Sequence, residues 1–421
     1  MSSRLSPQRL VLSNGIVLLV THNPTSDIIA ARLFLQAGML RENSSNWGLS
    51  HLVASVITKG TEQYNAQELA QVVESVGASL GTDSSSDYFL VSLKTVSEDF
   101  ERIFELAAEI LRSPTFPEKE LNTERNVTLQ GIKSRKEQSL ANALRPLRQE
   151  LHGEHPYAQT SYGVLETVEQ IQSQDLHQFH RDYFRPDELV ISIAGNITLE
   201  EAERFAQKYL GDWNNTTEAQ PRVVVKKPPK VTGLKFLPQV RDSQQTTVAF
   251  GYPAASVHHP DYLGLKFLIN YLCNGMSSRL FTELREKQGL AYEVSGFYPT
   301  RQDSTHLVTY LGTTPNKAEH ACNEMQRELT RLAEGAMTAD ELAIAKRKWA
   351  GQYALGKQTN AQLAQIFGWY EILGLSENHD QVFLEEMKAY PLERVHEVAQ
   401  NSLDHAICSI VGPEDSIQFA C

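Results

Sequence analysis

The sequence predicts an α+β fold made of two similar domains, each a sheet covered by helices. Three observations predict it. Strand-like and helix-like segments are mixed in each half, two segment types recur far apart, and a polar stretch rich in Lys and Pro separates the halves. The chain has 421 residues, which is long for one hydrophobic core and favours two or more domains.

The first half begins with strand signals. Short apolar runs at Leu10–Leu12 and Ile16–Val20 flank Asn14-Gly15, which predicts a hairpin. Ile28–Leu35 and Tyr88–Val96 have strand character, and Leu189–Ala194 is a continuous apolar run typical of a buried strand. Helical spacing of apolar residues predicts helices over Gly48–Lys59, Asn65–Val76, Ser97–Leu111, Glu118–Arg135 and Leu176–Tyr183.

An internal repeat decides the domain organisation. Leu189–Gly195 (LVISIAG) resembles Ala406–Gly412 (AICSIVG), and FPEKEL at 116–121 resembles MTADEL at 337–342, both at an offset of about 220 residues. A repeat of this length indicates duplicated domains rather than a solenoid of short units. We therefore expect domains over 1–215 and 230–421, joined by a linker over 216–229.

Composition narrows the classes of partner and compartment. The net charge is −12 and no basic block is present, which argues against nucleic acid and against docking on an anionic membrane. No apolar run approaches the length of a membrane span, and the N-terminal residues do not form a signal peptide pattern. We expect a cytoplasmic protein.

The segment Gly48–Thr61 carries the first chemical signal. Its apolar residues share one helix face, and the opposite face carries His51, Ala54, Ser55 and Thr58. A zinc helix of a peptidase needs two histidines four residues apart and a glutamate beside them. Because this helix has one histidine, the residues by themselves indicate no metal site.

A second signal lies in the other half. Ser277–Arg285 has the pattern of a serine-capped helix that Gly289 ends, and Ala291–Ser295 follows as a strand. A short turn between them can bring Arg285 and Tyr292 to one site, where both could donate hydrogen bonds to a peptide carbonyl or its oxyanion. The alternative is a surface charge beside a core tyrosine.

The pattern G-x-x-H-x-x-x-x-x-x-x-K-G-T resembles the zinc helix of the pitrilysin-type metallopeptidases. This family includes the mitochondrial processing peptidase and insulin-degrading enzyme, and its motif is H-x-x-E-H. Here Ala54 replaces the catalytic glutamate and Ser55 replaces the second histidine. The segment 124–131 resembles the pattern that carries the third ligand, but Gly131 stands at the ligand position. The resemblance implies antiparallel-rich sheets in both domains and no metal in this chain.

The pattern S-R-L-F-x-x-L-R-E-K-x-G-L-A-Y-x-V resembles the second-half motif of the same family. There the arginine and tyrosine contact substrate beside a zinc centre of the other half or subunit, and Arg285 and Tyr292 occupy these positions. The resemblance implies the zinc-less subunit of a heterodimeric endopeptidase. A homologous partner would carry the zinc, and peptides or unfolded segments would be the substrates in an enclosed chamber.

Two alternatives stay open at this point. Cytochrome bc core proteins resemble the same family and have largely lost catalysis, so the chain could be a structural or assembly protein. It could also be a peptide-binding homodimer. The intact Arg285 and Tyr292 motif weighs against a scaffold, which has no chemical use for it.

Overall fold

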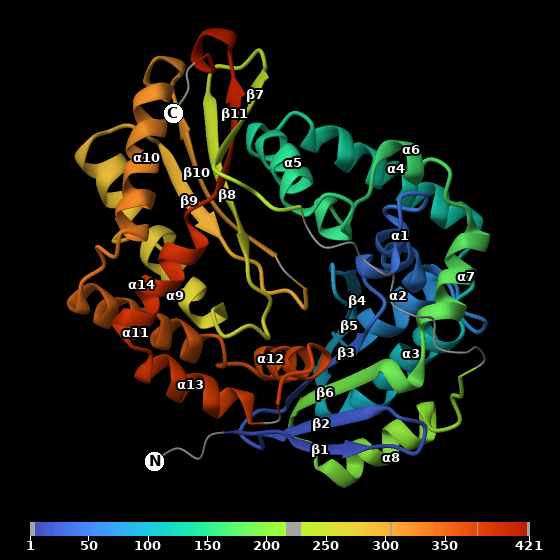
Figure 1. Ribbon diagram of the computed structural model, residues 1–421. Coiled ribbons are helices and arrows are strands. Elements are labelled where there is room, and N and C mark those ends of the chain that lie inside the picture. The colour runs from blue at the N-terminus through green and yellow to red at the C-terminus, as the bar shows by residue number, and fades with distance from the viewer. Residues whose placement is uncertain (1–4, 216–228, 304, 377, 419–421) are drawn as a thin grey trace. The chain divides into compact units, whose positions relative to one another are not determined.

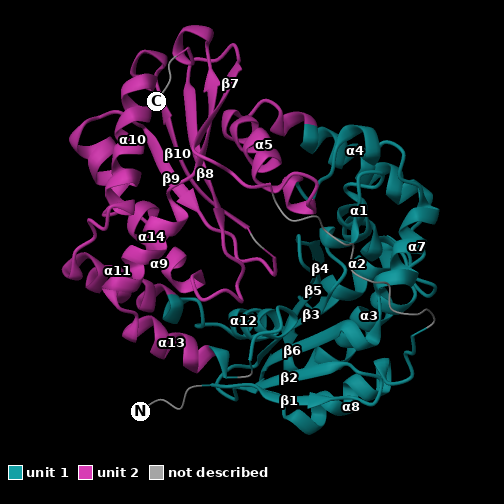
Figure 2. Ribbon diagram, in the orientation of Figure 1, with its two compact units in different colours: residues 1–132, 160–224, 353–379 teal, residues 133–159, 225–352, 380–421 magenta. Residues whose placement is uncertain are grey.

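The computed structural model describes residues 5–215, 229–303, 305–376 and 378–418. Most of the expected linker, over 216–228, lies outside the described residues. The chain folds into two compact units, each assembled from three stretches of sequence (Figure 2). Unit 1 is Met1–Ile132, Thr160–Val224 and Tyr353–His379, and unit 2 is Lys133–Gln159, Val225–Gln352 and Asp380–Cys421.

Unit 1 contains a six-stranded sheet with the order β1-β2-β6-β3-β5-β4 (Figure 1). The hairpin expected around Asn14-Gly15 is present as β1 and β2. β2 and β6 pair in parallel, and every other neighbouring pair is antiparallel. The strands are β1 (Gln8–Val11), β2 (Val17–His22), β3 (Ile28–Leu35), β4 (Ser79–Ser84), β5 (Phe89–Val96) and β6 (Leu189–Gly195).

Unit 2 repeats this topology with a five-stranded sheet in the order β7-β11-β8-β10-β9. β11 pairs in parallel with β7 and antiparallel with β8, as β6 does with β2 and β3. The structure thus confirms the α+β fold and the equivalence of Leu189–Gly195 with Ala406–Gly412. The strands are β7 (Leu234–Val240), β8 (Thr246–Ala254), β9 (Glu293–Phe297), β10 (Thr305–Thr313) and β11 (Ala406–Gly412).

Helices cover both faces of the sheet in unit 1. All seven residues of β6 are buried, and they alternate between two cores. Leu189, Ile191 and Ile193 face a large core formed with helices of the first half, while Val190 and Ala194 face α12 (Asn360–Ile372). The first-half helices are α1 (Leu49–Val56), α2 (Ala66–Ser75), α3 (Phe100–Arg112), α4 (Glu118–Arg135), α6 (Leu165–Val168), α7 (Ser173–Tyr183) and α8 (Leu199–Leu210).

The sheet of unit 2 is covered in the same way. α5 (Ser139–His152) comes from the first half of the chain, and its Ala143, Leu147 and Leu151 pack against β8, β10 and β11. α9, α10 and α14 lie on the side of the sheet opposite α5 (Figure 1). The remaining helices are α9 (Tyr262–Cys273), the π-helix η6 (Phe281–Lys287), α10 (Ala318–Ala333), α11 (Ala339–Leu355), α13 (His379–Ala389) and α14 (Leu392–Ser402).

No helix in the described part of the chain is both long and apolar enough to cross a membrane.

The close packing of α12 on its sheet makes Gly368 a sensitive position. A Cβ atom there would lie 2.4 Å from Cε2 of Phe34 and 2.8 Å from Cβ of Ser192. We expect Gly368→Ala to lower the free energy of unfolding by about 1–3 kcal/mol through overpacking, measured by urea denaturation.

The matched control is Gly351→Ala in α11, where an added Cβ meets no atom within 4 Å. This change should be neutral or stabilise by about 0.5–1 kcal/mol, because alanine is the better helix former. Equal effects of the two substitutions would contradict the close packing of α12 on its sheet.

Candidate functional site

The N-terminus of α1 is built around a buried carboxylate that sequence reasoning did not identify. Glu42 is fully buried and accepts hydrogen bonds from the backbone N–H groups of Gly48 (2.8 Å) and Ser50 (2.7 Å). These N–H groups lie where a helix has no internal acceptors, so Glu42 satisfies them. Burial raises the pKa of Glu42 to about 7 despite these bonds.

The backbone conformation and the close packing at the start of α1 require a glycine at position 48. Its φ is +97°, and a Cβ atom would lie 2.8 Å from the carbonyl oxygen of Tyr162. Only glycine accommodates both this backbone conformation and this close approach without strain. The first residue of the G-x-x-H pattern therefore sets how α1 meets the Tyr162 segment.

Two of the positions expected to have lost the zinc site, His51 and Gly131, lie beside one aromatic ring. The ring centroids of His51 and Tyr162 are 4.5 Å apart. Gly131, in α4, would place an added Cβ 3.9 Å from Cε1 of Tyr162. Tyr162 thus lies beside both the remaining histidine and the position of the third ligand. The sequence offered no motif that pointed to it.

The other two substituted positions, Ala54 and Ser55, take part in hydrogen bonds with other parts of the chain. Ala54 is buried, and its carbonyl oxygen accepts a hydrogen bond from Oγ1 of Thr82 (2.6 Å). The hydroxyl of Ser55 donates to the carbonyl oxygen of His51 (2.9 Å), one turn earlier. Neither residue offers an imidazole or carboxylate, and Gly131 has no side chain. These residues do not fit a zinc ion, which needs three or four such ligands.

The same result holds beyond α1. Across the described residues, no group of three or more His, Cys, Asp or Glu side chains could hold a metal ion. His152 is buried, and its Nε2 lies 2.7 Å from Nδ1 of His306. Burial lowers the pKa of His152 to about 3, which favours a neutral, structural pair.

An ion pair connects α4 with η2 (Ile57–Lys59), the 3₁₀-helix that directly follows α1. Nζ of Lys59, in the K-G-T part of the motif, lies 3.0 Å from Oε1 of Glu124 in α4. Both side chains are partly exposed, so the pair contributes about 0–1 kcal/mol. The lysine of the motif thus still contacts α4, although this contact adds little to stability.

Arg285 lies in η6, which is a π-helix where the sequence predicted an ordinary helix. Its side chain is exposed, and Cζ lies 4.9 Å from the ring centroid of Phe281 one turn earlier. Within the described part of the chain, no carboxylate lies within ion-pair distance of its guanidinium. A π-turn is uncommon and is often found at functional positions. The guanidinium is available as a hydrogen-bond donor.

Tyr292 lies just before β9, and its side chain is 41% exposed. Its backbone N–H donates to the carbonyl oxygen of Gly312 (3.1 Å), and its ring lies over this glycine. The hydroxyl makes a long hydrogen bond of 3.4 Å to the carbonyl oxygen of Thr313. Burial of the ring raises the pKa of Tyr292, so the hydroxyl keeps its proton at neutral pH.

The two residues are thus separate donors on one short segment. They are joined by Gly289 and Leu290, whose N–H groups donate to the carbonyl oxygens of Arg285 and Leu284. No hydrogen bond or cation–π contact connects Arg285 with Tyr292 among the described residues. Their substrate-binding role stays a prediction, while their exposure leaves both available to a molecule outside the chain.

Comparison with known proteins decides the family. Residues 17–193 match the family model described as Insulinase (Peptidase family M16), and residues 170–348 match the model described as Peptidase M16 inactive domain. The chain belongs to peptidase family M16. The resemblance to pitrilysin-type peptidases, and among them to the type of subunit without zinc, is confirmed.

Relatives of this M16 chain match nearly its full length. It is 28% identical over 409 residues to the uncharacterized zinc protease YmxG of Bacillus subtilis, covering 96% of this chain and 98% of the relative. It is 25% identical over 396 residues to the zinc protease PqqE of Helicobacter pylori, covering 92% and 89%.

Solved structures share the fold. A crystal structure titled as a peptidase M16 inactive domain from Pseudomonas fluorescens superimposes with a TM-score of 0.89 at 23% identity, covering 97% of this chain and 98% of that one. A protease from Helicobacter pylori superimposes with a TM-score of 0.91 at 21% identity, covering 97% and 100%. Both comparisons confirm the two-sheet α+β architecture.

Glu42 makes the stability of this M16 chain depend on pH. Its pKa is raised from 4.5 to about 7 on folding, so the folded chain binds more protons between these values. This contribution to stability is full below pH 4.5 and is lost as the pH rises through 7. We expect Glu42→Gln to flatten this decline by about 3 kcal/mol at most, measured as the free energy of unfolding at several pH values.

The difference between wild-type and variant isolates this one group, because other titrating residues contribute equally to both. A variant with the same slope as the wild-type between pH 4.5 and 7 would show that Glu42 ionises normally in the folded chain.

Proposed function

We propose that this chain is the zinc-less subunit of a two-subunit M16 endopeptidase and contributes Arg285 and Tyr292 to peptide hydrolysis at its partner's zinc site. The observation that carries the proposal is a contrast between the two halves. The zinc-ligand positions hold Ala54, Ser55 and Gly131, whereas the arginine and tyrosine of the second motif are both present and exposed.

The chemistry of the two side chains fits this role. A guanidinium is always charged and presents several N–H donors. The Tyr292 hydroxyl is protonated at neutral pH, since the ordinary pKa of tyrosine is 10.0 and burial raises it further. Two donors of this kind can orient a peptide carbonyl and stabilise the negative charge that develops on its oxygen. Neither can activate water, so a zinc-bearing homologous subunit would have to supply the metal and its bound nucleophile.

The polar groups of the Arg285 and Tyr292 side chains make only weak interactions with the rest of the described chain, which supports the proposal. The guanidinium of Arg285 lies against the Phe281 ring without an ion pair among the described residues, and the Tyr292 hydrogen bond to Thr313 is long. A carbonyl oxygen of a peptide could therefore replace a weak interaction rather than a strong one. A purely structural arginine would instead be expected to pair with a carboxylate, as Arg279 does with Glu328 (2.6 Å) in the same unit.

The proposal is tested in a complex of this chain with its zinc-motif homologue. We expect Arg285→Ala and Tyr292→Phe each to lower kcat/KM for a fluorogenic peptide by about 10²-fold, because each removes one donor to the developing oxyanion. Co-purification of the two subunits should be unchanged by either substitution.

Glu286→Gln is the matched control, since it changes a charge on the next, exposed residue of the same helix and should leave the rate unchanged. Full activity of both donor variants would remove the assigned role. A stable wild-type complex without peptidase activity would instead favour the structural or assembly protein.

A further inference from the structure

Unit 2 contains a cavity of about 290 Å³ between α9, η6 and α11. Its volume suits a single amino-acid residue or a ligand of that size. Neither Arg285 nor Tyr292 is among the residues that line it. The cavity is therefore a second candidate binding site, and ligand binding there does not depend on the proposed function.

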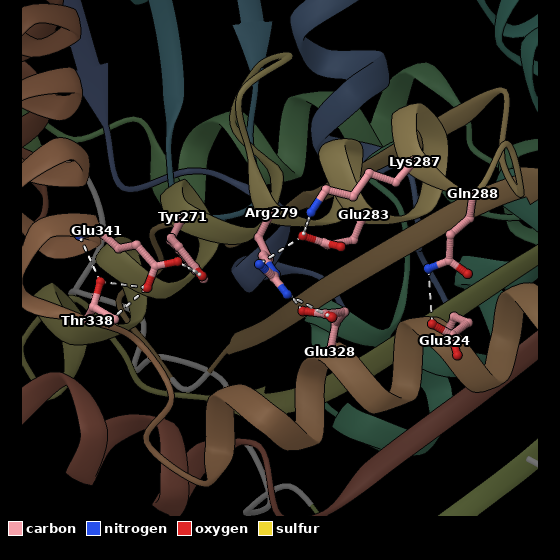
Figure 3. A network of polar contacts seen from close by, with 9 residues as sticks. All are labelled: Tyr271, Arg279, Glu283, Lys287, Gln288, Glu324, Glu328, Thr338 and Glu341. Carbon is pink, nitrogen blue, oxygen red and sulfur yellow. Dashed lines mark hydrogen bonds and ion pairs between the residues drawn. The ribbon is translucent and has the colours of Figure 1, made fainter.

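Most charges of the cavity wall neutralise one another. Figure 3 shows Glu283 between Arg279 and Lys287, and Arg279 paired with Glu328. The carboxylate of Glu283 lies 2.9 Å from a nitrogen of each cation, and that of Glu328 lies 2.6 Å from Nε of Arg279. Such a paired network fixes the wall but offers little net charge to a ligand.

The acidic group on the other side of the cavity is also satisfied. Glu341 accepts a hydrogen bond from the Tyr271 hydroxyl (2.7 Å) and bonds from the backbone N–H (2.8 Å) and hydroxyl (3.0 Å) of Thr338 (Figure 3). Its carboxylate is thus held at the N-terminus of α11 and is not directed at a ligand.

Lys348 is the exception among the charged residues that line the cavity. In the described part of the chain, no carboxylate lies within ion-pair distance of its ammonium. Nζ would lie 3.5 Å from a Cβ built on Gly275, at the chain reversal after α9. Partial burial lowers the pKa of Lys348, as expected for a cation that has lost water and gained no counter-ion. An anionic ligand group would supply this counter-ion.

Asn270 supplies an unused acceptor. Its side chain is more than nine-tenths buried, and within the described ranges Oδ1 has no hydrogen-bond partner. Its Nδ2 donates to Oε1 of Gln352 (3.4 Å), which also accepts from Asn274 (2.7 Å), so the amide nitrogen is directed to that side. A buried acceptor without a donor costs free energy, which a ligand N–H group in the cavity would recover.

The wall also has an apolar part. Ile344 is 53% exposed and lies on α11 next to Ala345, and both line the cavity. The hydroxyls of Ser277, Ser278 and Thr282 complete the lining beside the charged residues. Counting the described residues only, the site thus combines an unpaired cation, an unused acceptor, hydroxyl donors and an exposed aliphatic side chain.

We propose that this cavity binds the C-terminal residue of a peptide. An α-amido carboxylate with an apolar side chain has the three groups that complement the wall. Its carboxylate pairs with Lys348 and the serine hydroxyls, its amide N–H donates to Oδ1 of Asn270, and its side chain packs on Ile344. A peptide C-terminus carries the anion, the N–H donor and the aliphatic group within the span of one residue.

The test uses the full chain and N-acetyl-leucine, the smallest probe with all three groups, in an NMR or calorimetric titration. We expect binding in the millimolar range, given the small size of the probe. N-acetyl-leucinamide, which lacks the carboxylate, and N-acetyl-N-methyl-leucine, which lacks the N–H, should each bind at least about tenfold more weakly.

Two variants make the test specific to the site. Lys348→Gln should weaken N-acetyl-leucine binding at least about tenfold, whereas Arg347→Gln, which removes an exposed charge from the adjacent position of α11, should not. Both side chains are exposed or partly exposed, so both variants should stay folded. Absence of binding at tens of millimolar, or equal binding by Lys348→Gln and wild-type chains, would overturn the proposal.

Discussion

The structure depends on covering both faces of two sheets whose central strands, β6 and β11, are buried along their whole length. Every residue of β6 and of β11 is buried, so each sheet needs helices on both sides. Helices of the same half cover one face in each case. The other face is covered by a helix from the opposite half of the sequence, α12 in unit 1 and α5 in unit 2. Neither central strand could be buried on both faces without this exchange.

The exchange also follows the internal repeat. α5 comes after α4, which the first copy of the repeated motif opens, and α12 comes after α11, which the second copy opens. Each half of the sequence therefore supplies the equivalent helix to the unit that contains the other half's sheet. Each half passes from one unit to the other near the C-terminal end of its long helix, at 132/133 in α4 and at 352/353 in α11. The duplicated architecture is thus reciprocal and is not a simple succession of independent domains.

At the expected zinc site, ligands are missing and an aromatic side chain packs nearby. Tyr162 packs beside His51 and beside the position of Gly131, where an acidic ligand would have stood according to the family motif. Around it, the framework of α1 is retained: Glu42 accepts hydrogen bonds from the N–H groups of the helix start, and Gly48 permits the close approach of the Tyr162 segment. Lys59, just after α1, contacts Glu124 of α4. α1 thus stays packed in the core although it lacks the glutamate and the second histidine of the zinc motif.

The sequence could predict much of this fold. The hairpin at Asn14-Gly15, the buried strands Leu189–Gly195 and Ala406–Gly412, and the helices with one apolar face follow from local periodicity. α12 could not be predicted in this way, because its apolar residues do not form one clear stripe and Gly368 interrupts its centre. The strands that it covers belong to the other half of the sequence, so the contact itself leaves no local signal.

Some residues of the candidate site could likewise be predicted from local sequence, and others could not. His51, Ala54, Ser55, Gly131, Arg285 and Tyr292 could be named because a motif marks each of them. Glu42 and Tyr162 could not, since an acidic residue in a polar loop and a tyrosine before a glycine are common patterns without a fixed spacing to α1. Their importance comes from tertiary contacts: a buried carboxylate beneath two backbone N–H groups, and a ring beside a missing ligand.

We propose that the chemistry is divided between two chains, with no zinc in this one. The most direct test is elemental analysis of the chain purified alone after equilibration with zinc, with its zinc-motif homologue measured in parallel. The account predicts far less than one zinc per chain here and one per chain in the homologue. Stoichiometric zinc that is retained by this chain and lost in His51→Ala would contradict it.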